Sequence, residues 1–310
     1  MAKVRHGVAG EPIGHSLSPV LTAIVHSHLS RTEGLNMPGL KGVVVIPTDG
    51  VENALAWGYA GSLPSPPDWD LVGSPLGKFR ANTLLERAVT ASMEHVEADP
   101  RLPNAPLPKL NFEKPLLGTE EVWLSLTAPL KHQLSAAAVR CIDNAMEIRS
   151  VNTLRWDGRS WWAASTDGPG MMLVAEAFEH PVSGVLGITG GGGTARSVAA
   201  AWCESGGRVK QLGGNRLLDD DGPWVMCDDE PDICIDFDNG ESDIQVTYNP
   251  MKGDFESRIT HLSAVPDGRW LLCAQHLFSW ASLWAPHLTE FLPSLSLLMT
   301  RLVAVEVYLE

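Results

Sequence analysis

The sequence predicts an α/β protein of two domains, and three observations support that prediction. Segments with strand patterning alternate with segments of helical patterning along most of the chain, which favours parallel sheets covered by helices. At 310 residues the chain is long enough for about two domains of ordinary size. A run of four glycines also separates an apolar strand pattern from an Ala-rich helix pattern within residues 184–207.

The first half of the chain supplies most of the predicted strands. Residues 4–8 precede the loop GEPIGHSLSP, in which Ser18 is the expected N-cap and Pro19 the first residue of a helix. Residues 51–57 fit a short helix, and residues 128–140 fit a loop followed by a helix. Apolar or alternating patterns predict further strands at 41–47, 121–127, 150–156 and 160–166.

The second half continues the alternation with shorter elements. A helix is expected at 170–178, and the helix after the four glycines should end at Gly206-Gly207. Short apolar runs predict strands at 209–213, 233–237, 244–248 and 270–273. Helical patterning at 275–285 and 294–309 closes the chain.

Composition argues against several classes of partner. The chain carries 23 Lys and Arg against 37 Asp and Glu, a net charge of -14, which opposes binding to nucleic acid. No run of about 18 apolar residues predicts a membrane span, and the N-terminal residues lack the pattern of a signal peptide, so we expect a cytoplasmic protein. The five cysteines are scattered, which predicts small buried thiols and no metal site. The sequence does not decide the oligomeric state, so both a monomer and a homodimer stay open.

The glycine run has the spacing of a dinucleotide-binding loop. Gly190, Gly192 and Ala195 match G-x-G-x-x-A between a strand and a helix, where glycines let the backbone approach a pyrophosphate. We predict a Rossmann-like domain that holds the cofactor through Gly190, Gly191, Gly192, Gly193, Thr194 and Ala195.

The residues after the next strand favour NADP as the cofactor. Asn215 and Arg216 stand where an NAD site usually carries an acid, and a guanidinium suits the 2′-phosphate of NADP. The acidic run 219–221 follows directly and would repel that phosphate unless its side chains turn outward. NAD therefore stays open as the alternative.

Lys131 and Asp167 are the candidate catalytic pair. Each lies just past the carboxyl end of a predicted strand, and open α/β sheets bind ligands at the carboxyl ends of their strands. A Lys–Asp pair can exchange a proton with a substrate hydroxyl if burial and the neighbouring charge tune the lysine. Either residue alone could equally be a solvated surface charge.

Eight segments resemble the shikimate dehydrogenase family, which includes quinate/shikimate dehydrogenases. In chain order they are GEPIGHSLSP, LTAPLK, SVNTL, STDGPG, GGGGTAR, NR, TYNP and LLCAQ. The resemblance implies an NADP-dependent oxidoreductase that reversibly reduces 3-dehydroshikimate to shikimate, in the biosynthesis of chorismate and the aromatic amino acids.

The resemblance also implies roles for individual residues. Lys131 and Asp167 correspond to the family's catalytic lysine and aspartate. Ser16 and Ser18 correspond to the serines that hold the substrate carboxylate, and Asn152 to an asparagine that binds ring hydroxyls. The remaining expected substrate contacts are Thr127, Tyr248 and Gln275.

The chain departs from the family pattern at several positions. Ser125 and Ser165 stand where the family usually has Asn, and Arg149-Ser150 replaces Gly-Ala. Leu217, Leu218 and three aspartates follow Arg216 in place of Thr and a further basic residue. These departures keep three alternatives open, which are NAD as cofactor, quinate as substrate, and a dehydrogenase-like regulatory protein that binds ligand without turnover.

The motifs place the domain boundary away from the middle of the chain. We expect residues 1–166 together with 275–310 to form the substrate domain, and residues 167–274 to form the cofactor domain. The stretch between Ser18 and Thr127 is longer than the family requires, which predicts an insertion at about 61–118.

Overall fold

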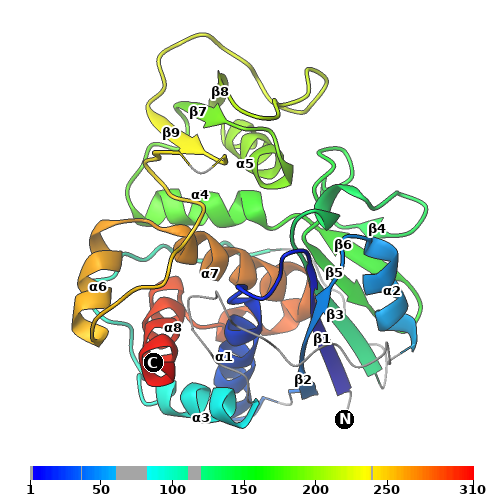
Figure 1. The fold of residues 1–310 in the computed structure, drawn as a ribbon, viewed down its shortest axis with the longest axis vertical. Helices are drawn as coiled ribbons and strands as arrows, with labels where there is room; N and C mark the ends of the chain where they lie inside the picture. The colour runs from blue at the N-terminus through cyan, green and yellow to red at the C-terminus, as the bar shows by residue number, and fades with distance from the viewer. Residues whose placement is uncertain (1–2, 36, 61–81, 111–119, 239) are drawn as a thin grey trace.

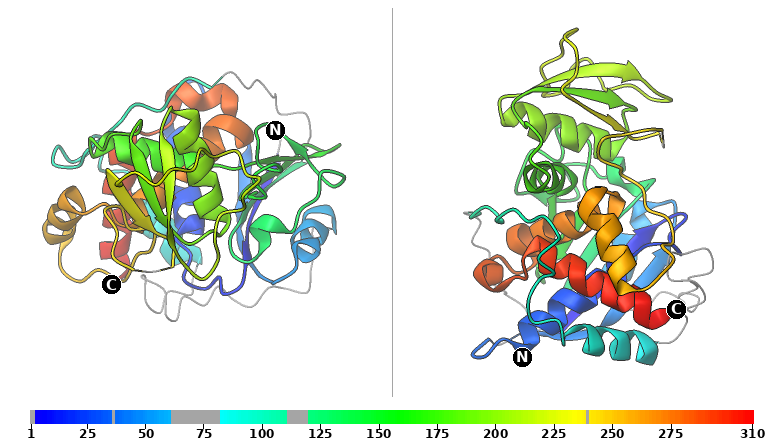
Figure 2. Two further views of the ribbon diagram at one scale, coloured as in Figure 1. Left: turned by 90° about the horizontal axis from the view of Figure 1, so that it is seen from above. Right: turned by 90° about the vertical axis from the view of Figure 1, so that its left-hand side faces the viewer.

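The computed structural model describes residues 3–35, 37–60, 82–110, 120–238 and 240–310. These residues form two sheets with helices packed around them, which confirms the predicted α/β class (Figure 1). Figure 2 shows the smaller sheet stacked on the larger part of the molecule. No helix in the described ranges is long and apolar enough to span a bilayer.

The larger sheet has six strands in the order β2-β1-β3-β5-β6-β4. β1 pairs in parallel with β2 and β3, whereas β5 pairs antiparallel with both β3 and β6. The sheet is therefore mixed and not parallel throughout, and the turn at 157–160 joins β5 to β6 as a hairpin. The strands are β1 Lys3–Gly10, β2 Gly39–Pro47, β3 Glu120–Leu126, β4 Arg140–Cys141, β5 Thr153–Trp156 and β6 Trp161–Ala164.

Helices cover both faces of the larger sheet. On one face α2 (Val51–Ala60) packs its buried residues against the apolar side chains of β3, β5 and β6. The other face is covered by α1 (Ser18–Arg31), α3 (Asn82–Ser92), α7 (Gly268–Ser279) and α8 (Leu295–Leu309). Three tryptophans occupy the centre of this layer in mutual ring contact, Trp123, Trp280 and Trp284. These three are among the 11 tryptophans of the chain, which outnumber its 7 Phe and 3 Tyr combined, so part of the tryptophan content belongs to the core.

The smaller sheet is parallel and has the order β8-β7-β9. Its strands are β7 Val185–Thr189, β8 Arg208–Gly213 and β9 Ile233–Asp236. Helix α5 (Gly193–Glu204) follows β7, and α4 (Asp167–Ala177) lies between the smaller sheet and α7. Helix α6 (Phe255–Ala264) packs against α8. We propose the domain boundary at 167, with 275–310 in the first domain, because β1–β6 precede it and β7–β9 follow it.

Several predicted elements differ in the structure. Residues 270–273 belong to α7 and not to a strand, because a four-residue apolar run does not distinguish a buried helix from a strand. Residues 244–248 form no strand; the backbone of Gln245 bonds instead to the loop residue Pro266. The helix within 128–140 is limited to Leu130–His132; turns follow it, and β4 begins at Arg140.

The start of α1 also differs from its prediction. The helix begins at Ser18, so the N-cap is Leu17, which makes no side-chain capping hydrogen bond. The Ser16 hydroxyl accepts the Ser18 backbone N–H at 3.2 Å instead. The cysteines are all free, but only Cys273 is fully buried and the other four are half-buried.

The predicted insertion at 61–118 lies largely outside the described residues. Its described part, 82–110, is packed against the C-terminal helix. The Thr300 hydroxyl accepts the backbone N–H of Asp99 at 3.0 Å, and the Arg301 side chain donates to the His95 carbonyl at 3.0 Å. Helix α3 thereby contributes buried apolar residues to the same core as α1 and α8.

Candidate active site

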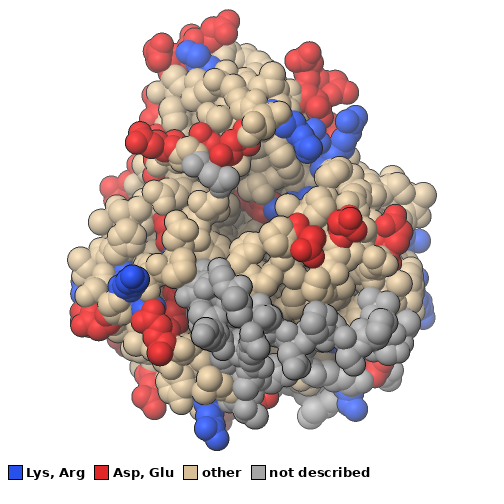
Figure 3. All heavy atoms as spheres, viewed as in Figure 1, with Lys and Arg blue, Asp and Glu red and all other residues tan. Residues whose placement is uncertain are grey.

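A cleft of about 570 Å³ lies between the two sheets and is hollowed into the face shown in Figure 3. Most of the predicted site residues line it. They are Ser16, Ser18, Thr127, Lys131, Asn152, Asp167, Gly192, Gly193, Thr194, Ala195, Arg216, Tyr248 and Gln275. Three predicted cofactor residues lie outside the lining, namely Gly190, Gly191 and Asn215.

Lys131 and Asp167 form an ion pair at the floor of the cleft. The Lys131 Nζ lies 2.5 Å from the Asp167 Oδ2, and the two side chains are 16% and 1% exposed. Lys131 follows the carboxyl end of β3, and Asp167 is the first residue of α4 after β6. An amine and a carboxylate in direct contact and open to a cleft can pass a proton to or from a bound hydroxyl.

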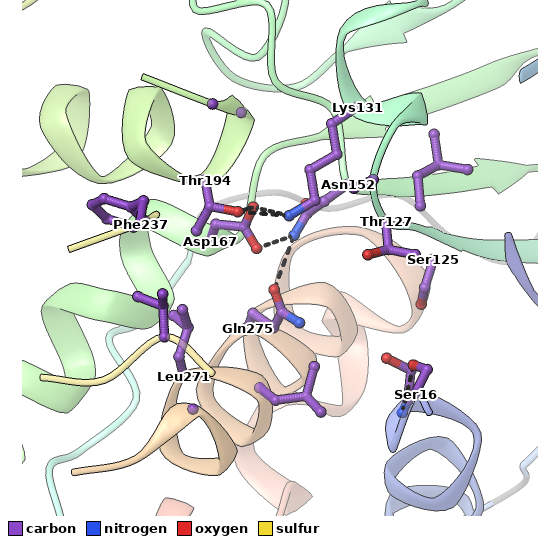
Figure 4. Close-up of a pocket in the computed structure, with 18 of the residues that line it drawn as sticks. Ser16, Ser125, Thr127, Lys131, Asn152, Asp167, Thr194, Phe237, Leu271 and Gln275 are labelled. Carbon is purple, nitrogen blue, oxygen red and sulfur yellow. Dashed lines mark hydrogen bonds and ion pairs between the residues drawn. The ribbon is translucent and has the colours of Figure 1, made fainter. Parts of the chain in front are cut away.

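Asn152 fixes the other oxygen of the Asp167 carboxylate (Figure 4). The Asn152 Nδ2 donates to the Asp167 Oδ1 at 2.9 Å and to the Gln275 Oε1 at 3.3 Å. The Asn152 Oδ1 accepts the Thr166 backbone N–H at 2.8 Å. Because both oxygens of Asp167 have partners, the carboxylate is held in one orientation toward Lys131.

Thr194 reaches this pair from the glycine loop. The Lys131 Nζ donates to the Thr194 Oγ1 at 2.9 Å, and the Thr194 hydroxyl donates to the Asp167 Oδ2 at 3.3 Å. Sequence reasoning assigned Thr194 to the cofactor alone. Its contact with the Lys131–Asp167 pair, called the dyad below, depends on how closely the two sheets approach each other. No local sequence pattern predicts that approach.

The Tyr248 side chain supports the loop that carries Ser16. The Tyr248 hydroxyl accepts the Leu17 N–H at 3.3 Å and donates to the His15 carbonyl at 3.4 Å. Burial raises the pKa of Tyr248 to about 12, so the phenol keeps its proton at neutral pH. The structure thus places Tyr248 near the predicted carboxylate site as a brace for the Ser16–Ser18 loop.

The buried Arg269 packs against the ring of Tyr248. The Arg269 guanidinium lies 5.5 Å from the centre of the Tyr248 ring and pairs with Asp267 at 2.6 Å and Glu306 at 3.1 Å. Arg269 and Glu306 are almost fully buried in α7 and α8. Sequence reasoning missed this cluster, although charges within apolar helical runs are a usable signal because buried charges need partners.

The glycine loop has the geometry of a phosphate-binding turn. Gly190 has a φ of +96°, which favours glycine, and its N–H donates to the Gly213 carbonyl at 2.9 Å. A side chain at Gly191 would come within 2.2 Å of the Leu217 backbone, whereas the position above Gly192 is open. Helix α5 then begins at Gly193, on the cleft, where its N-terminus can attract an anion.

The surroundings of Arg216 combine one cation with carboxylates. Arg216 is exposed and lines the cleft. Asp219 pairs with Arg196, at 3.0 Å, and with Arg149, at 3.6 Å. Asp238, which sequence reasoning missed, also lines the cleft, and its Oδ2 accepts the Asn215 N–H at 2.6 Å.

Two further residues of the lining lie at the larger sheet. Ser125, one of the departures from the family pattern, is half-buried and faces the cleft beside Thr127 (Figure 4). His276 is buried next to Gln275, and burial lowers its pKa to about 3, so its imidazole is neutral.

No group of His, Cys, Asp and Glu side chains within the described ranges could hold a metal ion.

Comparison with known proteins finds likeness in structure alone. No family model and no curated protein matches the sequence. The shikimate 5-dehydrogenase of Thermus thermophilus in complex with shikimate is 19% identical, with a TM-score of 0.57 over 97% of this chain and 99% of that one. The structure of the same enzyme in complex with NADP(H) and shikimate has a TM-score of 0.54. Shikimate dehydrogenase from Mycobacterium tuberculosis is 16% identical, with a TM-score of 0.55 over 97% and 98% of the two chains. The chain therefore has the fold of these two-domain shikimate dehydrogenases.

Proposed function

We propose that the protein is a shikimate dehydrogenase that reversibly reduces 3-dehydroshikimate to shikimate with NADPH. The observation that carries the proposal is the Lys131–Asp167 pair, held by Asn152 at the floor of a cleft between the two sheets. Both solved complexes of the Thermus thermophilus enzyme that share the fold contain shikimate, and one of them also contains NADP(H). The hydroxyl, amide and charged groups that line this cleft can bind ligands of that chemistry.

The dyad handles the proton of the reacting hydroxyl. In the direction of oxidation, the Lys131 amine takes the proton of the substrate hydroxyl while Asp167 stabilises the ammonium that forms. In the direction of reduction, the ammonium returns that proton to the developing alkoxide. The nicotinamide, when bound, accepts or supplies the hydride. Asn152 and Gln275 offer amide groups beside the dyad, where they can orient neighbouring ring hydroxyls.

The opposite end of the cleft suits a carboxylate. Ser16, Ser18 and Thr127 line the cleft, Figure 4 shows Ser16 apart from the dyad, and the phenol of Tyr248 braces the loop of the two serines. Hydroxyl donors hold a carboxylate without a buried counter-charge. The combination of this end with the dyad selects a small acid that carries ring hydroxyls.

Arg216 is the proposed contact for the 2′-phosphate of NADP. Asp219 is engaged by Arg149 and Arg196, which reduces its repulsion of a phosphate beside Arg216. Asp238 supports the second candidate, use of NAD, because a carboxylate beside the loop after β8 can accept a ribose hydroxyl.

A spectrophotometric assay at 340 nm tests the proposal. Purified protein is given shikimate or quinate with NADP⁺ or NAD⁺, which makes four reactions. The proposal predicts the highest kcat/KM for shikimate with NADP⁺. A preference for NAD⁺ or quinate would select that alternative, and ligand binding without reduction of either cofactor would show a binding protein and refute the enzyme.

A further inference from the structure

Thr194 connects the glycine loop directly to the catalytic pair. It is the second residue of α5, and its hydroxyl lies beside both the Lys131 amine and the Asp167 carboxylate (Figure 4). The approach of α5 is close along the whole lysine stem. A side chain at Gly193 would come within 3.2 Å of the Lys131 Cβ.

The hydrogen-bonding capacity of these groups fixes their roles. A threonine hydroxyl has one proton, and here it donates to the Asp167 Oδ2. Its oxygen can then accept a proton from the Lys131 Nζ, at 2.9 Å, while a second lysine proton goes to Asp167 at 2.5 Å. Two of the three free tetrahedral positions of the nitrogen are thereby occupied. The third, which is a lone pair in the neutral amine, points away from both partners.

We propose that Thr194 is a positioning residue that aims the Lys131 amine at the substrate hydroxyl. The proposal rests on the proposed function. A lysine stem has four rotatable bonds, so one carboxylate partner leaves the nitrogen free to turn about that contact. The second partner removes this freedom. Because the hydroxyl is carried by α5, the aim of the amine also depends on where the cofactor loop sits.

Two substitutions separate the hydroxyl from the shape of the side chain. Thr194→Val keeps the shape and removes the hydroxyl, and Thr194→Ser keeps the hydroxyl. Hydrogen bonds to charged groups are strong enough that we expect Thr194→Val to lower kcat about 10–100-fold. The KM for shikimate and the Kd for NADPH should stay within about threefold, and Thr194→Ser should restore most of the turnover.

A matched control and two contrary outcomes complete the kinetic test. Thr260→Val removes an exposed hydroxyl on α6, which donates only to the Glu256 carbonyl, and should leave kcat unchanged. If Thr194→Val weakens NADPH binding but keeps kcat, Thr194 is only a cofactor contact and the proposal is wrong. If Thr194→Ser is as slow as Thr194→Val, the side chain acts through packing, which also overturns it.

A second measurement does not depend on turnover. Brief acetylation followed by peptide mass spectrometry reports the reactivity of the Lys131 amine relative to the exposed Lys252 in the same sample. Thr194→Val should label Lys131 severalfold faster than the wild type, and Thr194→Ser should not. Equal labelling in all three proteins would overturn the proposal. An inactive wild type would refute the dehydrogenase function and leave this result to decide the role of Thr194.

Discussion

The two sides of the cleft are built differently. On the side of the larger sheet, Asn152, Thr153, Thr166 and Ser279 are buried and hydrogen-bonded to one another behind the dyad. On the side of the smaller sheet, the loop after β8 is exposed, and the space above Gly192 is open. Chemistry that needs fixed geometry therefore lies on the rigid side, and a long flexible cofactor can be accepted on the open side.

The packing beneath each side explains the difference. The larger sheet rests on the tryptophan cluster and on the buried Glu121–Arg155 pair, which is held by two hydrogen bonds of 2.8 and 2.9 Å. The smaller sheet has three short strands. Substitutions on the rigid side should therefore cost turnover or stability. On the open side, substitutions in the exposed loop after β8 should change cofactor affinity alone, whereas substitution of Thr194, which contacts Lys131, should lower turnover.

Loss of the lysine should have the largest effect. Lys131→Ala removes the proton carrier, and we expect kcat to fall by about a thousandfold while the thermal transition changes little. Steady-state kinetics and thermal unfolding measure the two quantities. Lys252→Ala, an exposed lysine, is the control. Unchanged turnover in the Lys131→Ala variant would show that Lys131 is not the proton carrier and that the larger-sheet side does not supply the chemistry.

Loss of Arg269 should have the next largest effect. Arg269→Met leaves Asp267 and Glu306 buried without their partner, so the free energy of unfolding should fall by about 3–5 kcal/mol. Urea denaturation measures it. Arg101→Met breaks a surface pair with Asp99 and should cost far less. Equal losses in the two variants would contradict the contrast between buried and exposed regions.

Acid should destabilise the rigid side through His276. Its folded pKa of about 3 lies below the ordinary value of 6.5, so the unfolded chain binds more protons and stability is lost as pH falls through this window. At pH 5 the loss from this group is about 2 kcal/mol relative to pH 7. Urea denaturation at both values should show that His276→Gln loses correspondingly less than the wild type. His6 nearby has a lowered pKa and is present in both proteins. Equal losses would show that His276 is not held neutral.

The smallest effect is expected on the open side. Arg216→Ala should raise the KM for NADPH about tenfold and leave the KM for NADH and the kcat unchanged, because one charged contact is lost. Arg159→Ala, an exposed arginine of the hairpin turn, serves as the control. A fall in kcat would contradict the assignment of Arg216 to cofactor binding alone. An unchanged KM for both cofactors would show that Arg216 does not contact the 2′-phosphate.

Local patterns in the sequence predict elements on both sides of the cleft. Strong alternation predicted β3, and the strand–glycine–helix pattern predicted β7 and α5, because these signals are local. The dyad was predicted from strand ends and motifs, and the structure joins its two residues. The contacts of Thr194, Asp238 and Arg269 arise from packing between distant segments, which no local spacing encodes. The mixed pairing of β5 follows from its hairpin, which the alternation of elements did not reveal.

A crystal structure of the protein grown with shikimate tests the central claim most directly. The account predicts the carboxylate of shikimate at the hydroxyls of Ser16 and Ser18, and its ring hydroxyls at Lys131, Asn152 and Asp167. Shikimate bound against the loop after β8, or a cleft that stays empty at saturating shikimate, would contradict the account.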